Sequence, residues 1–147
     1  MMADFMFNVA KGRHAYYAML PAADDSLIVV PIETTDIVGD STMEDYATLD
    51  ALLAGASNEQ TTMGRKTLAS VTSTVDNTND LVKVDAADVV WTAATGNDIS
   101  ALVVCYKPTA ASADSAVIPL YKYDFVIEVD GSDVTAVINT DGLAEAE

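Results

Sequence analysis

Short β-branched runs separated by turn residues fill the chain from residue 71 onward, and this spacing constrains the fold most. The runs cover residues 71–75, 82–84, 89–91, 101–106, 117–123, 125–129 and 134–138. Pro119 interrupts the fifth run, and the segments between runs are rich in Asp, Asn, Gly and Thr, which favour turns. Strands at intervals of about ten residues, with turns between them, indicate an antiparallel β-sandwich or a small barrel.

Two features define the centre and the end of the expected sheet. Residues 101–106 are continuously apolar, which is typical of a strand buried on both faces. An Asp130-Gly131 pair stands between the alternating runs 125–129 and 134–138. Because Asp-Gly is a strong signal for a β-hairpin turn, we expect these two runs to pair with each other.

The N-terminal part gives weaker signals. Residues 5–9 alternate apolar and polar side chains, as in a short opening strand. Residues 11–20 fit either a short helix or an extended arm, and we favour the helix. Residues 27–30 form a β-branched apolar run, which predicts a buried strand. Pro31 limits that strand to an edge or an end of a sheet.

The clearest helix signal covers residues 41–54. Ser41 is suited to cap its N-terminus, and Glu44 three residues later completes a capping box. Gly55 follows at the position where a glycine commonly ends a helix. Apolar side chains recur at helical spacing and give one apolar face: Met43, Tyr46, Leu49, Leu52 and Leu53.

These patterns together predict one domain spanning residues 1–147, mainly β with α+β character and with one or two N-terminal helices. The chain is long enough to bury a sizeable core. Residues 1–20 are a candidate interface arm. The tail, residues 143–147, is acidic, and we expect it to be frayed.

The charge balance excludes two classes of partner. Asp and Glu number 23 against 7 Lys and Arg, which gives a net charge of −16. A chain this acidic cannot neutralise a row of phosphates, so we expect no nucleic acid partner. An anionic membrane surface is disfavoured for the same reason. Half of the residues are apolar, which argues against general disorder.

The cysteine count and the length of the apolar runs indicate where in the cell we expect the protein. A single cysteine, Cys105, cannot form an internal disulfide, and we expect it to be a buried apolar residue. The longest apolar runs are too short to cross a bilayer. The first residues lack both a basic segment and an apolar core, so we expect no secretion signal and synthesis in the cytoplasm.

Two short motifs are similar to enzyme motifs. Gly39-Asp40-Ser41 is similar to the nucleophile block of GDSL-type hydrolases, but the chain's one histidine, His14, lies upstream of it. We therefore favour a helix cap for Ser41. Met63-Gly64-Arg65-Lys66-Thr67, with Ser70 beyond, is similar to the phosphate-binding segment of dihydrofolate reductases, whose α/β pattern this chain lacks. A small soluble reductase is a remote alternative.

Metal and cofactor signals are weak. Asp76, Thr78 and Asp80 imitate the first half of a calcium loop, but Leu81 replaces its glycine and Ala87 its final glutamate. A divalent ion at the acidic turns stays an open alternative. We expect no cofactor and no enzymatic activity, and we expect Trp91 to be a core residue.

Several sequence blocks, in the same order along the chain, resemble blocks of a known protein family. They include Phe7-Asn8-Val9-Ala10-Lys11-Gly12-Arg13, residues 45–55, Arg65-Lys66-Thr67-Leu68, Trp91-Thr92-Ala93, residues 102–108, residues 114–120, Asp124-Phe125 and residues 130–136. From residue 3 to about residue 140 the chain resembles a family of small virion proteins of tailed bacteriophages. The tail, residues 143–147, differs from the apolar and basic ending of that family.

The resemblance implies a non-enzymatic structural protein, most simply a capsid decoration protein on the exterior of the phage head. Its implied partners are the major capsid protein and further copies of itself, as a trimer or other small homo-oligomer. The implied location is the virion. A tail or fibre component that contacts the host is the alternative.

Eight residues are candidates for the assembly interface. The aromatic candidates are Phe5, Phe7, Tyr16 and Tyr17, since aromatic side chains dominate interface energies. The basic candidates are Lys11, Arg13, Arg65 and Lys66. The alternatives are core packing for the aromatic residues, which we favour, and solubility or local ion pairing for the basic ones.

Overall fold

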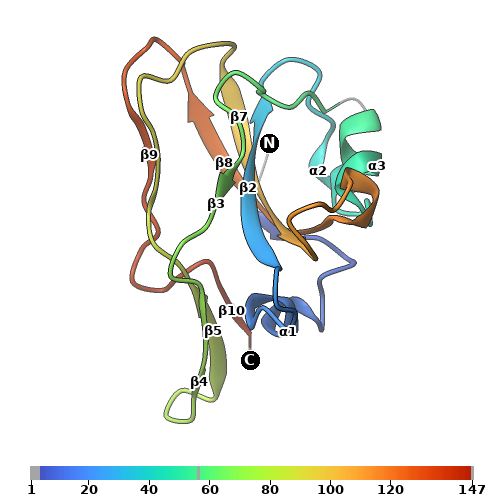
Figure 1. Ribbon diagram of the computed structural model, residues 1–147, viewed down its shortest axis with the longest axis vertical. Coiled ribbons are helices and arrows are strands. Elements are labelled where there is room, and N and C mark those ends of the chain that lie inside the picture. Colours follow the sequence, from blue (N-terminus) through green and yellow to red (C-terminus); the bar gives the residue numbers. More distant parts are fainter. Residues whose placement is uncertain (1–3, 56, 147) are drawn as a thin grey trace.

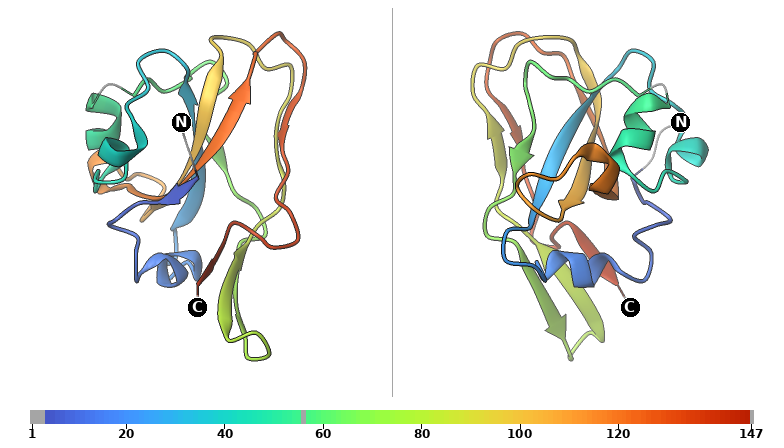
Figure 2. Two further views of the ribbon diagram at one scale, coloured as in Figure 1. Left: turned by 180° about the vertical axis from the view of Figure 1, so that it is seen from behind. Right: turned by 45° about the vertical axis from the view of Figure 1, so that its right-hand side comes forward.

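A five-stranded antiparallel sheet forms the centre of the computed structural model, which describes residues 4–55 and 57–146. Short helices cover one face of the sheet and a two-stranded ribbon covers the other, which gives three layers (Figures 1 and 2). In spatial order the strands are β1 (Phe5–Met6), β8 (Ile118–Ile127), β7 (Ile99–Lys107), β2 (Ser26–Glu33) and β3 (Lys66–Thr67). The predicted β-rich α+β fold is confirmed.

Strands β2 and β7 are the buried centre of this sheet. They pair along their whole length, with Ile28 opposite Cys105, and Cys105 is fully buried. The predicted central strand is therefore confirmed. The predicted placement of Pro31 at an edge or an end is wrong, because Pro31 lies inside β2, which is not an edge strand, and pairs with Leu102 on β7. The side of Pro31 that lacks an N–H faces residue 60, whose N–H donates to the Pro31 carbonyl.

The helix predicted over residues 41–54 is two helices, α2 (Asp40–Met43) and α3 (Leu49–Ala54). The break coincides with contacts to a segment distant in sequence, around Asn8. The Glu44 carbonyl accepts a hydrogen bond from the Asn8 N–H at 2.9 Å, and the Asp45 carboxylate accepts one from the Asn8 side chain at 2.7 Å. Thr48 is extended and its hydroxyl accepts from the Ala51 N–H at 3.2 Å, so it caps α3.

The predicted cap at Ser41 is wrong, because Gly39 precedes α2 and Ser41 is an exposed residue within it. Gly55 does end α3, although its φ of −88° is not left-handed. A side chain at Gly55 would collide with the Tyr46 hydroxyl, which donates to the Gly55 carbonyl at 3.4 Å. The glycine is required here for a close approach rather than for a backbone conformation.

The remaining helices are short. Helix α1 (His14–Ala18) lies within the segment for which we favoured a helix. A single 3₁₀ turn, η1 (Asp114–Ala116), precedes β8. Strand β8 runs without interruption through Pro119 and covers most of the runs 117–123 and 125–129, which were predicted as separate strands. Its register with β7 shifts beside Pro119.

The hairpin predicted at Asp130-Gly131 is wrong, although the turn itself is present. Strand β9 (Val134–Ala136) pairs with β6 (Val89–Trp91) and not with β8. Gly131 adopts the left-handed φ of +93°, and its N–H donates to the Ala94 carbonyl at 2.8 Å. This contact docks the turn on the loop after β6, so the chain leaves it along β6.

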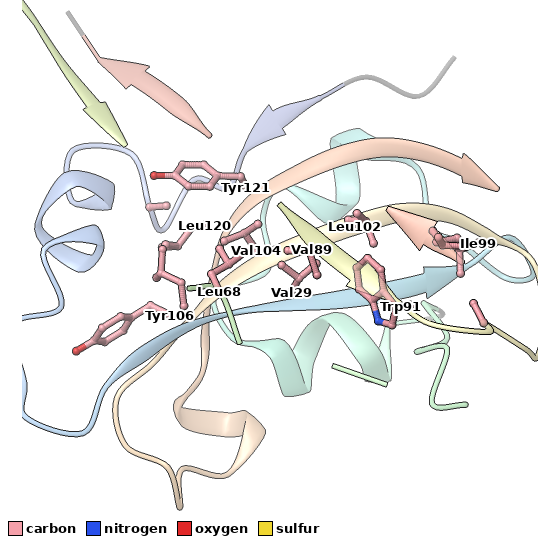
Figure 3. Packing of buried hydrophobic residues seen from close by; sticks show 14 residues of the cluster. Val29, Leu68, Val89, Trp91, Ile99, Leu102, Val104, Tyr106, Leu120 and Tyr121 are labelled. Atoms are coloured by element: carbon pink, nitrogen blue, oxygen red, sulfur yellow. The ribbon is translucent and has the colours of Figure 1, made fainter. Parts of the chain in front are cut away.

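Two apolar clusters fill the space on either side of the sheet. One lies between the sheet and the β6–β9 ribbon and includes Val29, Leu102, Val104 and Trp91 (Figure 3). Trp91 is 2% exposed and its indole N–H donates to the Gly64 carbonyl at 2.9 Å, which confirms it as a core residue. The other cluster lies under the helices and includes Ile28, Val30, Val103, Phe7, Met43, Leu49 and Leu52.

A separate three-stranded sheet projects from this body (Figures 1 and 2). Its order is β10 (Ala144–Ala146), β5 (Leu81–Asp85) and β4 (Thr72–Asp76). The expected fraying of the tail is wrong for residues 144–146, because the Leu143 N–H donates to the Val84 carbonyl at 2.7 Å and β10 pairs with β5. Residues 1–3 of the candidate arm and Glu147 of the tail lie outside the described residues.

Candidate functional site

The segment around α1 presents the most exposed group of the predicted interface residues. The inward side of this segment carries three buried residues spaced four apart: Ala10, His14 and Ala18. Arg13 and Tyr16 lie on the outward side, where Tyr16 is 58% exposed. Three residues beyond Tyr16 stands Met19, which is 68% exposed and which the sequence did not single out. We call Arg13, Tyr16 and Met19 the α1 surface.

The other aromatic candidates are held inside the chain. Phe7 is fully buried, so it is a core residue rather than an interface anchor. The ring of Phe5 meets the Phe7 ring edge-on at a centroid distance of 5.1 Å. Tyr17 packs against Tyr106 at 4.7 Å. Core packing therefore accounts for Phe7 and Tyr17, and Tyr16 is the aromatic candidate with a largely free ring.

Tyr106 fixes α1 to the end of the sheet. Its hydroxyl donates to the Asp25 carboxylate at 2.8 Å. Burial, followed by this hydrogen bond to Asp25, raises the pKa of Tyr106 to about 12. A tyrosine is protonated at neutral pH, and the raised pKa keeps this phenol protonated to higher pH, so it can donate to Asp25 while Tyr17 packs on its ring.

His14 is a structural residue in the described contacts. Its Nδ1 lies 2.7 Å from the Tyr121 hydroxyl, and the side chain is buried. Burial lowers the pKa of His14 and raises the pKa of Tyr121, so both groups are neutral at pH 7. The partner of His14 is thus Tyr121, whereas Ser41 of the hydrolase-like motif is exposed on α2.

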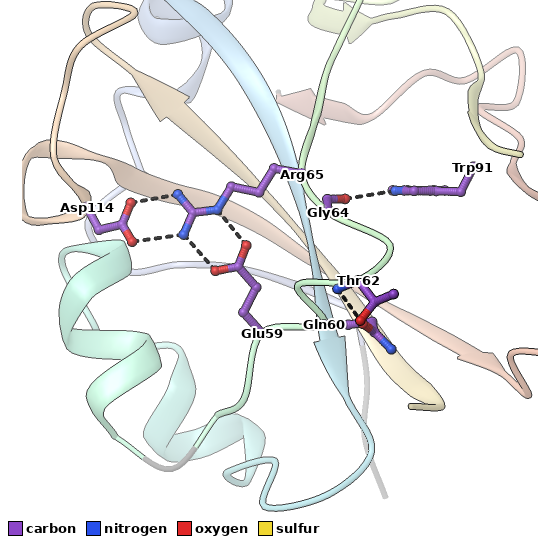
Figure 4. A network of polar contacts seen from close by, with 7 residues as sticks. All are labelled: Glu59, Gln60, Thr62, Gly64, Arg65, Trp91 and Asp114. Atoms are coloured by element: carbon purple, nitrogen blue, oxygen red, sulfur yellow. Dashed lines mark hydrogen bonds and ion pairs between the residues drawn. The ribbon is translucent and has the colours of Figure 1, made fainter. Parts of the chain in front are cut away.

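Arg65 is held between two carboxylates (Figure 4). Its guanidinium donates to both oxygens of Glu59, each at 2.7 Å, and to those of Asp114 at 2.6 and 2.8 Å. The hydrogen bond from Arg65 lowers the pKa of Asp114. These contacts join the segment before β3 to η1, and they engage four of the five N–H donors of Arg65 within the chain.

The other basic candidates have freer side chains. Lys11 is exposed and donates to the Asn8 side chain at 2.6 Å. Lys66 is half-buried on β3, which belongs to an antiparallel sheet rather than to the α/β sheet of the reductase-like motif. Lys11, Arg13 and Lys66 form no ion pair with another residue of the described ranges.

Lys122 is a buried cation that the sequence did not single out. It is fully buried on β8 and forms ion pairs with Asp40 of α2, at 3.2 Å, and with Asp124. Its ammonium group also lies 5.6 Å from the centre of the Phe5 ring. The one available signal was a lysine inside an otherwise apolar run. Strand alternation places Lys122 opposite to Tyr121 and Tyr123, on the helix side.

A cavity and the acidic turn at Asp76 are the remaining candidate sites among the described residues. A cavity of about 270 Å³ lies between the sheet and the segment after β9, and its lining is chiefly apolar, with Val29, Leu102 and Phe125 among it. The Asp76 carboxylate accepts hydrogen bonds from Asn79 and from the Thr78 N–H, so it closes a turn. In residues 4–55 and 57–146, no group of three or more His, Cys, Asp or Glu side chains is placed to hold a metal ion.

Two further findings complete the description. Among the described helices, none combines the length and apolarity needed to cross a membrane. Comparison with protein-family models, with curated proteins and with solved structures finds no match to this chain.

Proposed function

We propose that this chain is a non-enzymatic structural protein of a phage virion, and that it decorates the exterior of the capsid. The sequence blocks that resemble small virion proteins support this proposal. The observation that carries it is the α1 surface, an exposed basic and apolar patch on a chain with a net charge of −16.

The α1 surface has the composition of a docking site. Three of the seven basic residues, Arg65, Lys83 and Lys122, are paired with carboxylates inside the chain. Arg13 is exposed and unpaired within the described residues, and it lies beside exposed Tyr16 and Met19. Arg, Tyr and Met are enriched in protein interfaces, and Arg and Tyr supply much of their energy. A partner surface that carries carboxylates around an apolar centre would complement this patch.

The proposed mechanism is mechanical. Many copies would bind across neighbouring subunits of the major capsid protein and add interface area to the assembled shell. Because the copies bind the assembled state and not the separated subunits, they stabilise the shell by mass action. The acidic side chains elsewhere on the surface would face outward, and their repulsion would keep decorated particles apart.

The direct test mixes the purified protein with phage capsids that lack it. We expect saturable binding at a fixed number of copies per capsid and a higher temperature of capsid disassembly. Arg13→Glu and Tyr16→Ala should each weaken binding at least about tenfold, as expected of central interface residues.

Lys66→Glu is the matched control for Arg13→Glu. It makes the same change in charge at a lysine on β3, outside the α1 surface, and should leave binding within about twofold of the wild type. Binding that Lys66→Glu weakens and Arg13→Glu does not would move the docking site to β3. An absence of saturable uptake by the capsids would contradict the proposed function.

A further inference from the structure

We propose that two copies of this chain associate by antiparallel pairing of their β4 strands about a twofold axis centred on Thr74. Three observations carry this inference: the free edge of β4, its residue order and its position on the projecting hairpin. It goes beyond decoration of a capsid, and it holds whether or not the chain is a virion protein.

The outer side of β4 has no partner strand among the described residues. In the three-stranded sheet β4 pairs with β5 alone, so alternate residues from Thr72 to Asp76 direct their N–H and C=O groups outward. Among the strands of residues 4–55 and 57–146, β4 is the longest that has one side entirely without a partner strand. Exposed edges are usually protected by lysine, proline or a bulge, and the segment 72–75 contains none of these.

The residue order of β4 is self-complementary. With Thr74 opposite Thr74 of the second copy, Thr72 faces Asp76 and Ser73 faces Val75. No like charges then stand opposite each other, and the threonine hydroxyls can donate to the facing carboxylates. Val75, which is 65% exposed in one copy, would gain a neighbour on the side away from its β5 partner Val82. Burying this valine favours association.

The shape of the molecule permits this pairing. The β4–β5 hairpin projects away from the five-stranded sheet and from α2 and α3, with α1 beside its base (Figures 1 and 2). When two hairpins pair antiparallel, each points back toward the other's base, so the two bodies lie at opposite ends of the shared sheet. Parallel pairing would instead bring the two bodies side by side. The expected assembly is therefore a twofold dimer, which falls within the trimer or other small homo-oligomer that the family resemblance implies.

The deciding variant is Thr74→Glu. In a single copy the new carboxylate stands opposite Lys83 on β5, which favours the hairpin. In the dimer two glutamates would face each other on the axis. Thr135→Glu is the matched control, since it makes the same change at an exposed threonine on β9, away from β4.

Sedimentation equilibrium over a range of concentrations measures the association. We expect a monomer–dimer equilibrium for the wild type and for Thr135→Glu. For Thr74→Glu we expect a dimer dissociation constant at least about tenfold higher than that of the wild type. Equal association of Thr74→Glu and the wild type, a wild-type trimer, or a wild type that stays monomeric would overturn the proposal.

A cysteine pair tests the register independently of the affinity. Thr74→Cys places two thiols opposite each other on the axis, so mild oxidation should yield a disulfide-linked dimer quickly. Thr135→Cys should cross-link much more slowly, and native Cys105 is buried and does not compete. Equal cross-linking rates for the two variants would exclude this register. Capsid binding is a separate assay, so either proposal can fail without the other.

Discussion

The basic side chains of this acidic chain make different contacts, because guanidinium and ammonium groups differ in shape and in number of donors. The planar guanidinium of Arg65 holds two carboxylates at once, each through two hydrogen bonds. The ammonium of Lys122 is a point charge, and it sits fully buried between Asp40 and Asp124. Both residues therefore join separate segments of the chain, which leaves Arg13 as an outward-facing cation beside exposed apolar side chains.

Removal of Arg65 should destabilise the fold. Arg65→Ala leaves the Glu59 and Asp114 carboxylates facing each other without a cation, and we expect a loss of about 1–2 kcal/mol, since the site is partly exposed to water. Arg65→Lys should lose less, because it keeps the charge but not the paired hydrogen bonds. Urea unfolding measures both, with Lys66→Ala expected within about 0.5 kcal/mol of wild type. Equal losses at Arg65 and Lys66 would contradict the structural role of Arg65.

His14 should make stability depend on pH near neutrality. Burial lowers its pKa in the folded state, so below the ordinary value of 6.5 the unfolded chain binds a proton more readily. The free energy of unfolding should therefore fall as the pH drops from 7.5 to 5.5. His14 is the chain's one histidine, so His14→Gln should remove most of this slope. Wild type and His14→Gln with the same slope in urea unfolding would refute the assignment.

At the scale of elements, segments distant in sequence decide where the helices end. The apolar spacing from Met43 to Leu53 fits one helix. However, the Glu44 carbonyl accepts a hydrogen bond from the Asn8 N–H, and Thr48 caps the start of a second helix. Local periodicity contains no information about Asn8. For this reason the sequence predicts the helical region correctly and its continuity wrongly.

Replacement of each possible capping residue by alanine tests whether the region is two helices or one. Thr48→Ala should cost about 1 kcal/mol, because the Thr48 hydroxyl accepts from the Ala51 N–H. Ser41→Ala should change stability by less than about 0.5 kcal/mol, since Ser41 lies exposed within α2. Thermal unfolding of the two variants under identical conditions gives the comparison. A larger loss for Ser41→Ala would instead support the continuous helix.

The strands were more predictable than their partners. The apolar runs of β2 and β7 identify buried strands directly, because strands covered on both faces carry few polar residues. The partner of β9 was missed, since its choice depends on the contact between Gly131 and Ala94 rather than on the Asp-Gly turn alone. The interface candidates show the same limit of sequence information. The sequence identifies aromatic candidates by residue type, but only the fold shows that Phe7 is buried and Tyr16 is exposed.

At the scale of the whole molecule, the acidic residues are compatible with a dense fold because many of them accept hydrogen bonds from turns. Asp88, Asp98 and Asp133 accept from the backbone N–H groups of Ile138, Val129 and Ala93 at 2.7–2.8 Å. These carboxylates fix the loops that carry the β6–β9 ribbon. Much of the net charge of −16 therefore lies in turns and on the outer surface, which is compatible with the proposed outer coat of a repeating particle.

The central claim is that this chain decorates a phage head, and cryo-electron microscopy of the phage particles in which we propose that it occurs tests this claim most directly. The fold described here, with its projecting β4–β5 hairpin, is distinctive enough to be fitted into well-resolved density. We predict copies at regular lattice positions on the outside of the head, with the α1 surface turned toward the major capsid protein. Copies found only on the tail or its fibres, or no copies in the virion, would contradict the account.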